Sequence, residues 1–129
     1  MDVARLNAIP LFESFSRDDL RKIAPFAEEH SVGDGETLVR EGDYSYDLMI
    51  IEEGKAEVRH AGDKIAELGT GDFFGEMGVL ERDRRNADVV AVSPMRLISF
   101  KTYDVKRMER NLPAAVEKLR EAIAERRRN

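Results

Sequence analysis

Closely spaced turn signals limit what residues 28–100 can fold into. Glycine recurs there beside aspartate and other turn-forming residues, in the clusters Gly33-Asp34-Gly35, Glu41-Gly42-Asp43, Glu53-Gly54, Ala61-Gly62-Asp63 and Gly69-Thr70-Gly71. Glycine adopts positive φ without steric cost, and an aspartate side chain can hydrogen-bond the backbone of a turn. The intervals leave room only for short strands, and this spacing is typical of an antiparallel sandwich or barrel.

The intervals themselves have the residue pattern of strands, which we expect over 37–40, 48–52, 55–60, 64–68, 88–92 and 96–100. The run from Leu48 to Ile51 is apolar throughout and predicts a central strand, whereas Ala56 and Val58 alternate with charged residues and predict a half-buried one. The predicted fold class is therefore mainly β, a jelly roll or similar barrel of antiparallel strands.

Residues 1–27 have a helical pattern instead. A short helix is expected from Asp2 to Asn7, with Pro10 as its limit. Ser16, followed three residues later by Asp19, forms a capping-box pattern that predicts the start of a second helix. We expect this segment to cover one end of the barrel.

Helical patterns return at the other end, over 102–128. Thr102 is the expected N-cap of a helix that ends at Asn111, and Pro113 suits the first turn of the next helix. That next helix has one apolar stripe at helical spacing, formed by Leu112, Val116, Leu119 and Ile123. The stripe can pack on the barrel, cover a ligand or pair with a second copy of the chain.

Composition sets the broad class of the protein. The 129 residues are 42% hydrophobic and 36% charged, contain no cysteine and carry a net charge of −5. We therefore expect a single domain over 1–129, without disulfides or thiolate metal sites. No apolar run is long enough for a membrane span and the N-terminus lacks signal-peptide features, so the expected location is cytoplasmic, without a membrane partner. The acidic charge argues against nucleic-acid binding by this chain alone.

The stretch from Phe73 to Ala91 contains the candidate site. Gly75 to Gly78 can bring backbone N–H groups close to a ligand at the start of a very short helix, and the charged loop that follows ends on Arg84-Arg85. Free N–H groups and guanidinium donors both suit phosphate oxygens, so the stretch predicts a pocket for a small phosphorylated ligand. The alternative is a loop between two strands that carries a surface ion pair.

The residues Phe74-Gly75-Glu76-Met77-Gly78, with Arg85-Asn86-Ala87 after a variable loop, resemble the phosphate-binding cassette of cyclic nucleotide-binding domains. That family includes catabolite-activator-type regulators, regulatory subunits of protein kinase A and cyclic-nucleotide-gated channels. The resemblance covers nearly the whole chain. It implies an eight-stranded antiparallel β-roll over 28–100, a jelly-roll-like double-stranded β-helix, with its cassette at 74–87. It also implies N-terminal helices and C-terminal hinge and lid helices.

The resemblance also implies a role for each site residue. Glu76 would accept a hydrogen bond from the ribose 2′-hydroxyl, and Arg85 would pair with the cyclic phosphate. Gly75, Met77 and Gly78 would supply close backbone and N–H donors. The remaining ligand-binding residues it implies are Phe74, Asn86 and Ala87.

Two departures from the family pattern affect this assignment. Arg84 adjoins Arg85, so two arginines compete for the phosphate role; Arg85 fits the spacing from Glu76, and Arg84 is then expected to face solvent. Asn86 stands where the family has Ser, Thr or Ala. Because threonine there accompanies preference for cyclic GMP, the expected ligand is cyclic AMP, with cyclic GMP as the alternative.

The expected function is a regulatory module that moves its C-terminal helices when a cyclic nucleotide binds, and that acts on a protein effector or through a homodimer. An enzyme is not expected, because His30 and His60 show no metal-ligand spacing and no serine or threonine accompanies a recognisable base. The alternatives are a domain that keeps the fold only as an interaction scaffold, and a fragment of a larger catabolite-activator-type transcription regulator.

Overall fold

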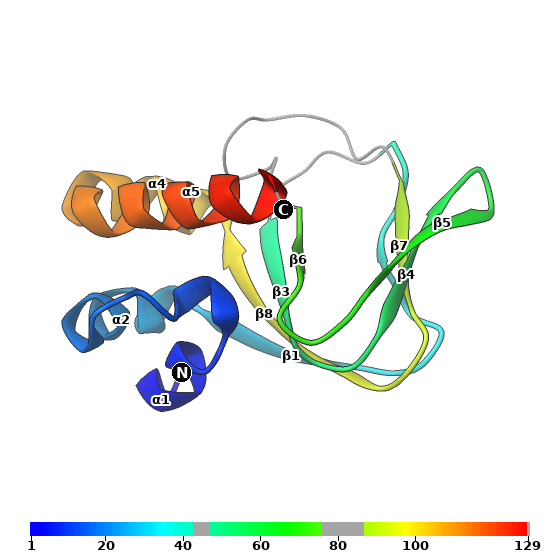
Figure 1. Cartoon of the computed structure of the whole chain (residues 1–129), viewed down its shortest axis with the longest axis horizontal. Helices are drawn as coiled ribbons and strands as arrows, with labels where there is room; N and C mark the ends of the chain where they lie inside the picture. Colours follow the sequence, from blue (N-terminus) through cyan, green and yellow to red (C-terminus); the bar gives the residue numbers. More distant parts are fainter. Residues whose placement is uncertain (43–46, 76–86, 129) are drawn as a thin grey trace.

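The computed structural model describes residues 1–42, 47–75 and 87–128, which form three layers (Figure 1). Helices form the first layer, a four-stranded sheet lies in the middle, and a second four-stranded sheet lies on the far side. We call these the middle sheet and the outer sheet. The predicted mainly β fold with flanking helices is confirmed.

Every strand pairs antiparallel with its neighbours. In spatial order, the middle sheet contains β1 (Glu28–Val32), β8 (Met95–Lys101), β3 (Asp47–Glu53) and β6 (Phe73–Phe74). The outer sheet contains β2 (Thr37–Val39), β7 (Asp88–Ala91), β4 (Ala56–His60) and β5 (Asp63–Leu68). The helical layer contains α1 (Val3–Asn7), η1 (Pro10–Phe12), α2 (Arg17–Ile23), η2 (Ala24–Phe26), α4 (Thr102–Asn111) and α5 (Pro113–Arg128).

Strand β3 of the middle sheet is covered on both faces, which explains its apolar run. Leu48 and Ile50 belong to the core beneath the helices, whereas Ile51 belongs to the core between the two sheets. Side chains alternate across a strand, so a strand covered on both faces needs apolar residues at every position. The prediction that this run forms a central strand is confirmed.

The two N-terminal helices begin at side-chain caps. The Asp2 carboxylate accepts from the N–H groups of Ala4 and Arg5, and the Ser16 hydroxyl accepts from the N–H of Asp19 at 3.1 Å. Such caps satisfy N–H groups that have no partner within the helix. The Ser16 cap is the one that the sequence pattern predicted.

The predicted N-cap at Thr102 is wrong by one residue. The helix begins at Thr102 itself, and the N-cap is Lys101, which has extended backbone (φ −70°, ψ 140°). Lys101 is also the last residue of β8, so the chain passes from strand to helix without a linker. A strand end already has the extended conformation that an N-cap requires, and here no side-chain cap is used.

The apolar stripe of α5 packs on the chain's own core. Val116, Leu119 and Ile123 are at most 2% exposed. With Phe12 and Phe100 they belong to the core between the helices and the middle sheet, which we call the helical core. Leu112, which separates α4 from α5, is partly buried against the same core. Both C-terminal helices therefore lie on the middle sheet beside the N-terminal helices (Figure 1).

No helix in the described part of the chain is both long and apolar enough to cross a membrane. The edge strands of the two sheets are short, with at most six residues each.

Candidate ligand-binding site

Apolar side chains from both sheets pack together in the space between them, and we call this cluster the inner core. Its buried members are Val39, Ile51, Ala56, Phe74, Val89, Ala91, Met95 and Leu97. Five further apolar side chains pack against it and keep some exposure to solvent, namely Val32, Leu38, Met49, Val58 and Leu68. A ligand that enters between the sheets would therefore meet apolar walls and lose contact with water there.

Phe74 is the first candidate site residue, and it points into the inner core. It is 7% exposed and pairs in register with Met49 on β3. Its neighbour Phe73 packs against the helical core instead, on the opposite face of the sheet. Gly75 follows with φ 79°, a left-handed conformation that favours glycine and turns the chain away from β6.

The other end of the candidate segment returns to the outer sheet. Ala87 is 9% exposed, and Val89 on β7 is buried in the inner core opposite Val39 and Val58. Asp88 fixes this end, because its carboxylate accepts from the Glu41 N–H at 2.6 Å. The carboxylate of Glu41 in turn contacts the ring of His60 at the end of β4.

Phe74 and Val89 therefore bring both ends of the segment to the same apolar interior, one end from each sheet. The three candidates that the structure describes, Phe74, Gly75 and Ala87, all lie at these ends. The candidates Glu76, Met77, Gly78, Arg85 and Asn86 lie outside the described residues. Arg84 and the very short helix expected from Gly75 to Gly78 lie outside them as well.

An ion-pair network that sequence reasoning missed joins α1 to the middle sheet. Arg5 donates to the two carboxylate oxygens of Glu52, from Nε at 3.0 Å and from Nη2 at 2.6 Å. Its Nη1 also lies 2.6 Å from Glu29 Oε1. These hydrogen bonds raise the pKa of Arg5, with Glu52 the larger contributor. No sequence signal could have found the network, since 47 residues separate Arg5 from Glu52.

The histidines have structural partners in this fold. His30 Nε2 lies 2.8 Å from Oγ of Ser99, the one buried polar residue among those described. Within the described residues, no group of three or more histidine, aspartate or glutamate side chains is placed to hold a metal ion.

Comparisons with known proteins bear directly on this geometry. The family model described as "Cyclic nucleotide-binding domain" matches residues 29–111, from β1 to the end of α4. A cyclic nucleotide-gated potassium channel from Rhizobium etli is 32% identical over 120 residues, which is 93% of this chain and 34% of the channel. The type II regulatory subunit of cAMP-dependent protein kinase from Drosophila melanogaster is 29% identical, over 92% of this chain and 32% of that protein.

Solved structures agree with these sequence matches. The catabolite activator protein of Thermus thermophilus superimposes with a TM-score of 0.77 and 27% identity, over 92% of this chain and 58% of that one. The chain spans about one third of the length of the channel and of the kinase subunit.

Proposed function

Because the chain belongs to the cyclic nucleotide-binding domain family, we propose that it binds cyclic AMP and passes the binding event to its C-terminal helices. The observation that carries this proposal is the segment Gly75-Glu76 to Arg85-Asn86-Ala87, which leaves the middle sheet at Phe74 and enters the outer sheet at Asp88. A ligand held by this segment would lie against the inner core.

In this proposal each end of the segment supplies one polar contact. Glu76 accepts a hydrogen bond from the ribose 2′-hydroxyl, and Arg85 pairs with the cyclic phosphate. A guanidinium presents several N–H donors in a fixed plane, which suits phosphate oxygens better than a lysine does. In the same proposal Arg84 takes no part in phosphate binding, and Asn86 favours cyclic AMP over cyclic GMP because it lacks the hydroxyl that accompanies guanine preference in the family.

The apolar walls support the placement of the base. Met49 and Val58 pack against the inner core from opposite sheets and are not fully buried. Burying an apolar ring face against such side chains is favourable in proportion to the area removed from water. The purine would supply that face, while the sugar and phosphate stay with the polar segment.

In this proposal, ligand binding affects the C-terminal helices through the middle sheet, which lies between the proposed site and the helices. On β3, Ile51 faces the inner core, and the adjacent Ile50 packs beneath the helices. On β8, Leu97 and Ile98 divide in the same way, and β8 continues into α4. A ligand can shift the helices only if it binds one arrangement of them more tightly than the other. The middle sheet offers the contact through which that difference acts.

Isothermal titration calorimetry with cyclic AMP, cyclic GMP and 5′-AMP tests the proposal. We expect saturable one-to-one binding of cyclic AMP, weaker binding of cyclic GMP and little binding of 5′-AMP, whose phosphate is not cyclic. At about a hundred times the dissociation constant, cyclic AMP should also stabilise the fold by ~2.7 kcal/mol. If neither cyclic nucleotide binds, the domain acts as an interaction scaffold and the proposal is wrong.

A further inference from the structure

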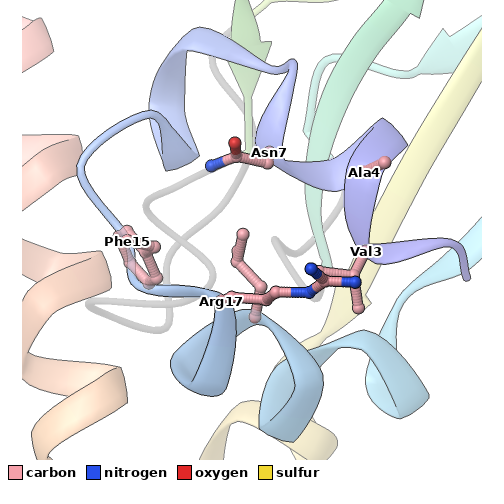
Figure 2. Close-up of a pocket in the computed structure, with 6 residues that line it drawn as sticks. Val3, Ala4, Asn7, Phe15 and Arg17 are labelled. Atoms are coloured by element: carbon pink, nitrogen blue, oxygen red, sulfur yellow. The ribbon is translucent and has the colours of Figure 1, made fainter.

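A hollow lies between α1 and α2, on the helical side of the middle sheet (Figure 1 and Figure 2). Its volume is about 270 Å³. It is lined by Val3, Ala4, Asn7, Phe15, Arg17 and Leu20. All of these residues belong to the N-terminal helices and their connection, so among the described residues the hollow and the candidate site have no member in common.

The floor of this hollow is apolar and fixed in place. Leu20 is 1% exposed and Phe15 is 5% exposed, and both belong to the helical core. The Phe15 ring meets the edge of Phe12 with ring centres 5.3 Å apart, and Lys118 Nζ lies 5.3 Å from the centre of the Phe15 ring. The packing of Phe15 and Leu20 in the helical core therefore holds the floor of the hollow in place, so a ligand can bind there without rearranging it.

The rim of the hollow carries one cation, Arg17, that pairs with no described residue. Arg17 is exposed, and within the described residues its guanidinium makes no ion pair or side-chain hydrogen bond. Figure 2 shows its side chain extending from the start of α2 toward Val3. The acids next to it in sequence pair elsewhere, Asp18 with Lys22 at 3.1 Å and Asp19 with Lys118 at 3.5 Å. None of the described lining residues carries a carboxylate.

We propose that this hollow is a binding site for a small organic acid, whose carboxylate pairs with Arg17 and whose apolar body packs against Val3, Phe15 and Leu20. A planar guanidinium pairs with a carboxylate through two parallel hydrogen bonds, and apolar walls select a ligand with an apolar body. Pockets for drug-sized ligands are usually about 300–1,000 Å³, so this smaller volume suits a compact monocarboxylate rather than a nucleotide.

Phenylacetate is a suitable probe, because it joins one aromatic ring to one carboxylate. We would titrate it into methyl-labelled protein and record methyl shifts and intermolecular nuclear Overhauser effects. Saturable binding with contacts from the phenylacetate ring to the methyl groups of Val3 and Leu20 is expected. The neutral analogue phenylacetamide has nearly the same shape and should bind about ten-fold more weakly or worse, since it cannot form the charged pair.

Variants provide a second measurement. Arg17→Gln should weaken phenylacetate binding about ten-fold, whereas Arg21→Gln, on the same helix but outside the lining, should leave it unchanged. The proposal is overturned if phenylacetate gives no saturable shift, if its contacts map to the inner core, or if phenylacetamide binds equally well. The comparison of the two ligands needs no variant, and none of these outcomes depends on whether cyclic AMP binds.

Discussion

Arg5 on α1 and Glu52 on β3 form a bidentate ion pair, with N–O distances of 3.0 and 2.6 Å. The Glu52 side chain is only 19% exposed, and Arg96 Nε approaches the same carboxylate at 3.9 Å. The pair therefore ties a five-residue helix, too short to be stable alone, to the middle sheet.

Glu52→Gln should release this tie. We expect a lower melting temperature and faster amide hydrogen exchange confined to α1, because the guanidinium loses one of its two carboxylate partners and keeps only Glu29. Glu67→Gln is the matched control, since it removes a carboxylate from an exposed pair on β5. Equal effects of the two substitutions, or unchanged exchange in α1, would contradict the assignment.

Gly54 should tolerate no side chain. Its φ is +112°, and a Cβ there would lie 2.7 Å from the Pro94 carbonyl oxygen and 2.7 Å from Met95 Cγ. Gly62 also has positive φ, at +87°, but a Cβ there would have open space. In urea unfolding, Gly62→Ala should therefore cost about 1 kcal/mol from backbone strain alone, and Gly54→Ala about 3 kcal/mol or more. Similar losses at the two positions would show that the close approach at Gly54 is relieved at little cost.

Arg85→Ala should weaken cyclic AMP binding about 10- to 100-fold, because hydrogen bonds to a charged group contribute about 1.5–3 kcal/mol each. Arg84→Ala should change the affinity little. Calorimetric titration of both variants measures the difference, with circular dichroism to establish that each is folded. The reverse pattern would move the phosphate role by one residue.

Ile123→Ala should destabilise the whole fold by about 2–4 kcal/mol, because Ile123 is fully buried in the helical core and truncation leaves a cavity. Glu121→Ala, on the exposed side of α5, should stay within about 0.5 kcal/mol of the unchanged protein. Chemical denaturation with both variants provides the measurement. A negligible loss for Ile123→Ala would mean that α5 leaves this core in solution.

The pKa of Glu67 should lie below the usual range for a glutamate, because Lys64 Nζ donates to its carboxylate at 2.6 Å. A folded-state pKa below the unfolded one means that the pair stabilises the fold above the unfolded pKa. That contribution is lost as pH falls through the folded pKa. Carbon-13 NMR of the side-chain carboxyl across an acid titration measures the pKa, and Lys64→Ala should return it toward the ordinary value. An identical titration curve in the variant would rule out the pairing.

Local chemistry made much of this fold predictable. The apolar run from Leu48 to Ile51, the Ser16 cap and Pro113 at the start of α5 each signal their structure within a few residues. β1 gave a weaker signal, because its polar residues from Glu28 to Ser31 are mostly exposed at a sheet edge and show no apolar alternation. The two residues of β6 are too few to form a pattern.

For the candidate site as well, the sequence predicts features formed by neighbouring residues and does not predict contacts between distant segments. The motif from Gly75 to Ala87 could be recognised because its residues are close in sequence. The structure adds that Phe74 and Val89, from different sheets, share one interior. Contacts such as Asp88 with Glu41, or Lys118 with Asp19, depend on how distant segments pack and leave no trace in the local sequence.

Strand β8 continues directly into α4, without a linker residue between sheet and helix. Leu112 is the one residue between α4 and α5, and it has non-helical backbone (φ −136°, ψ 56°). Under the proposed function, the two C-terminal helices would pivot against each other about the torsions of this one residue while α4 stays continuous with the sheet. A reporter pair placed on either side of Leu112 would register that pivot as a change of angle.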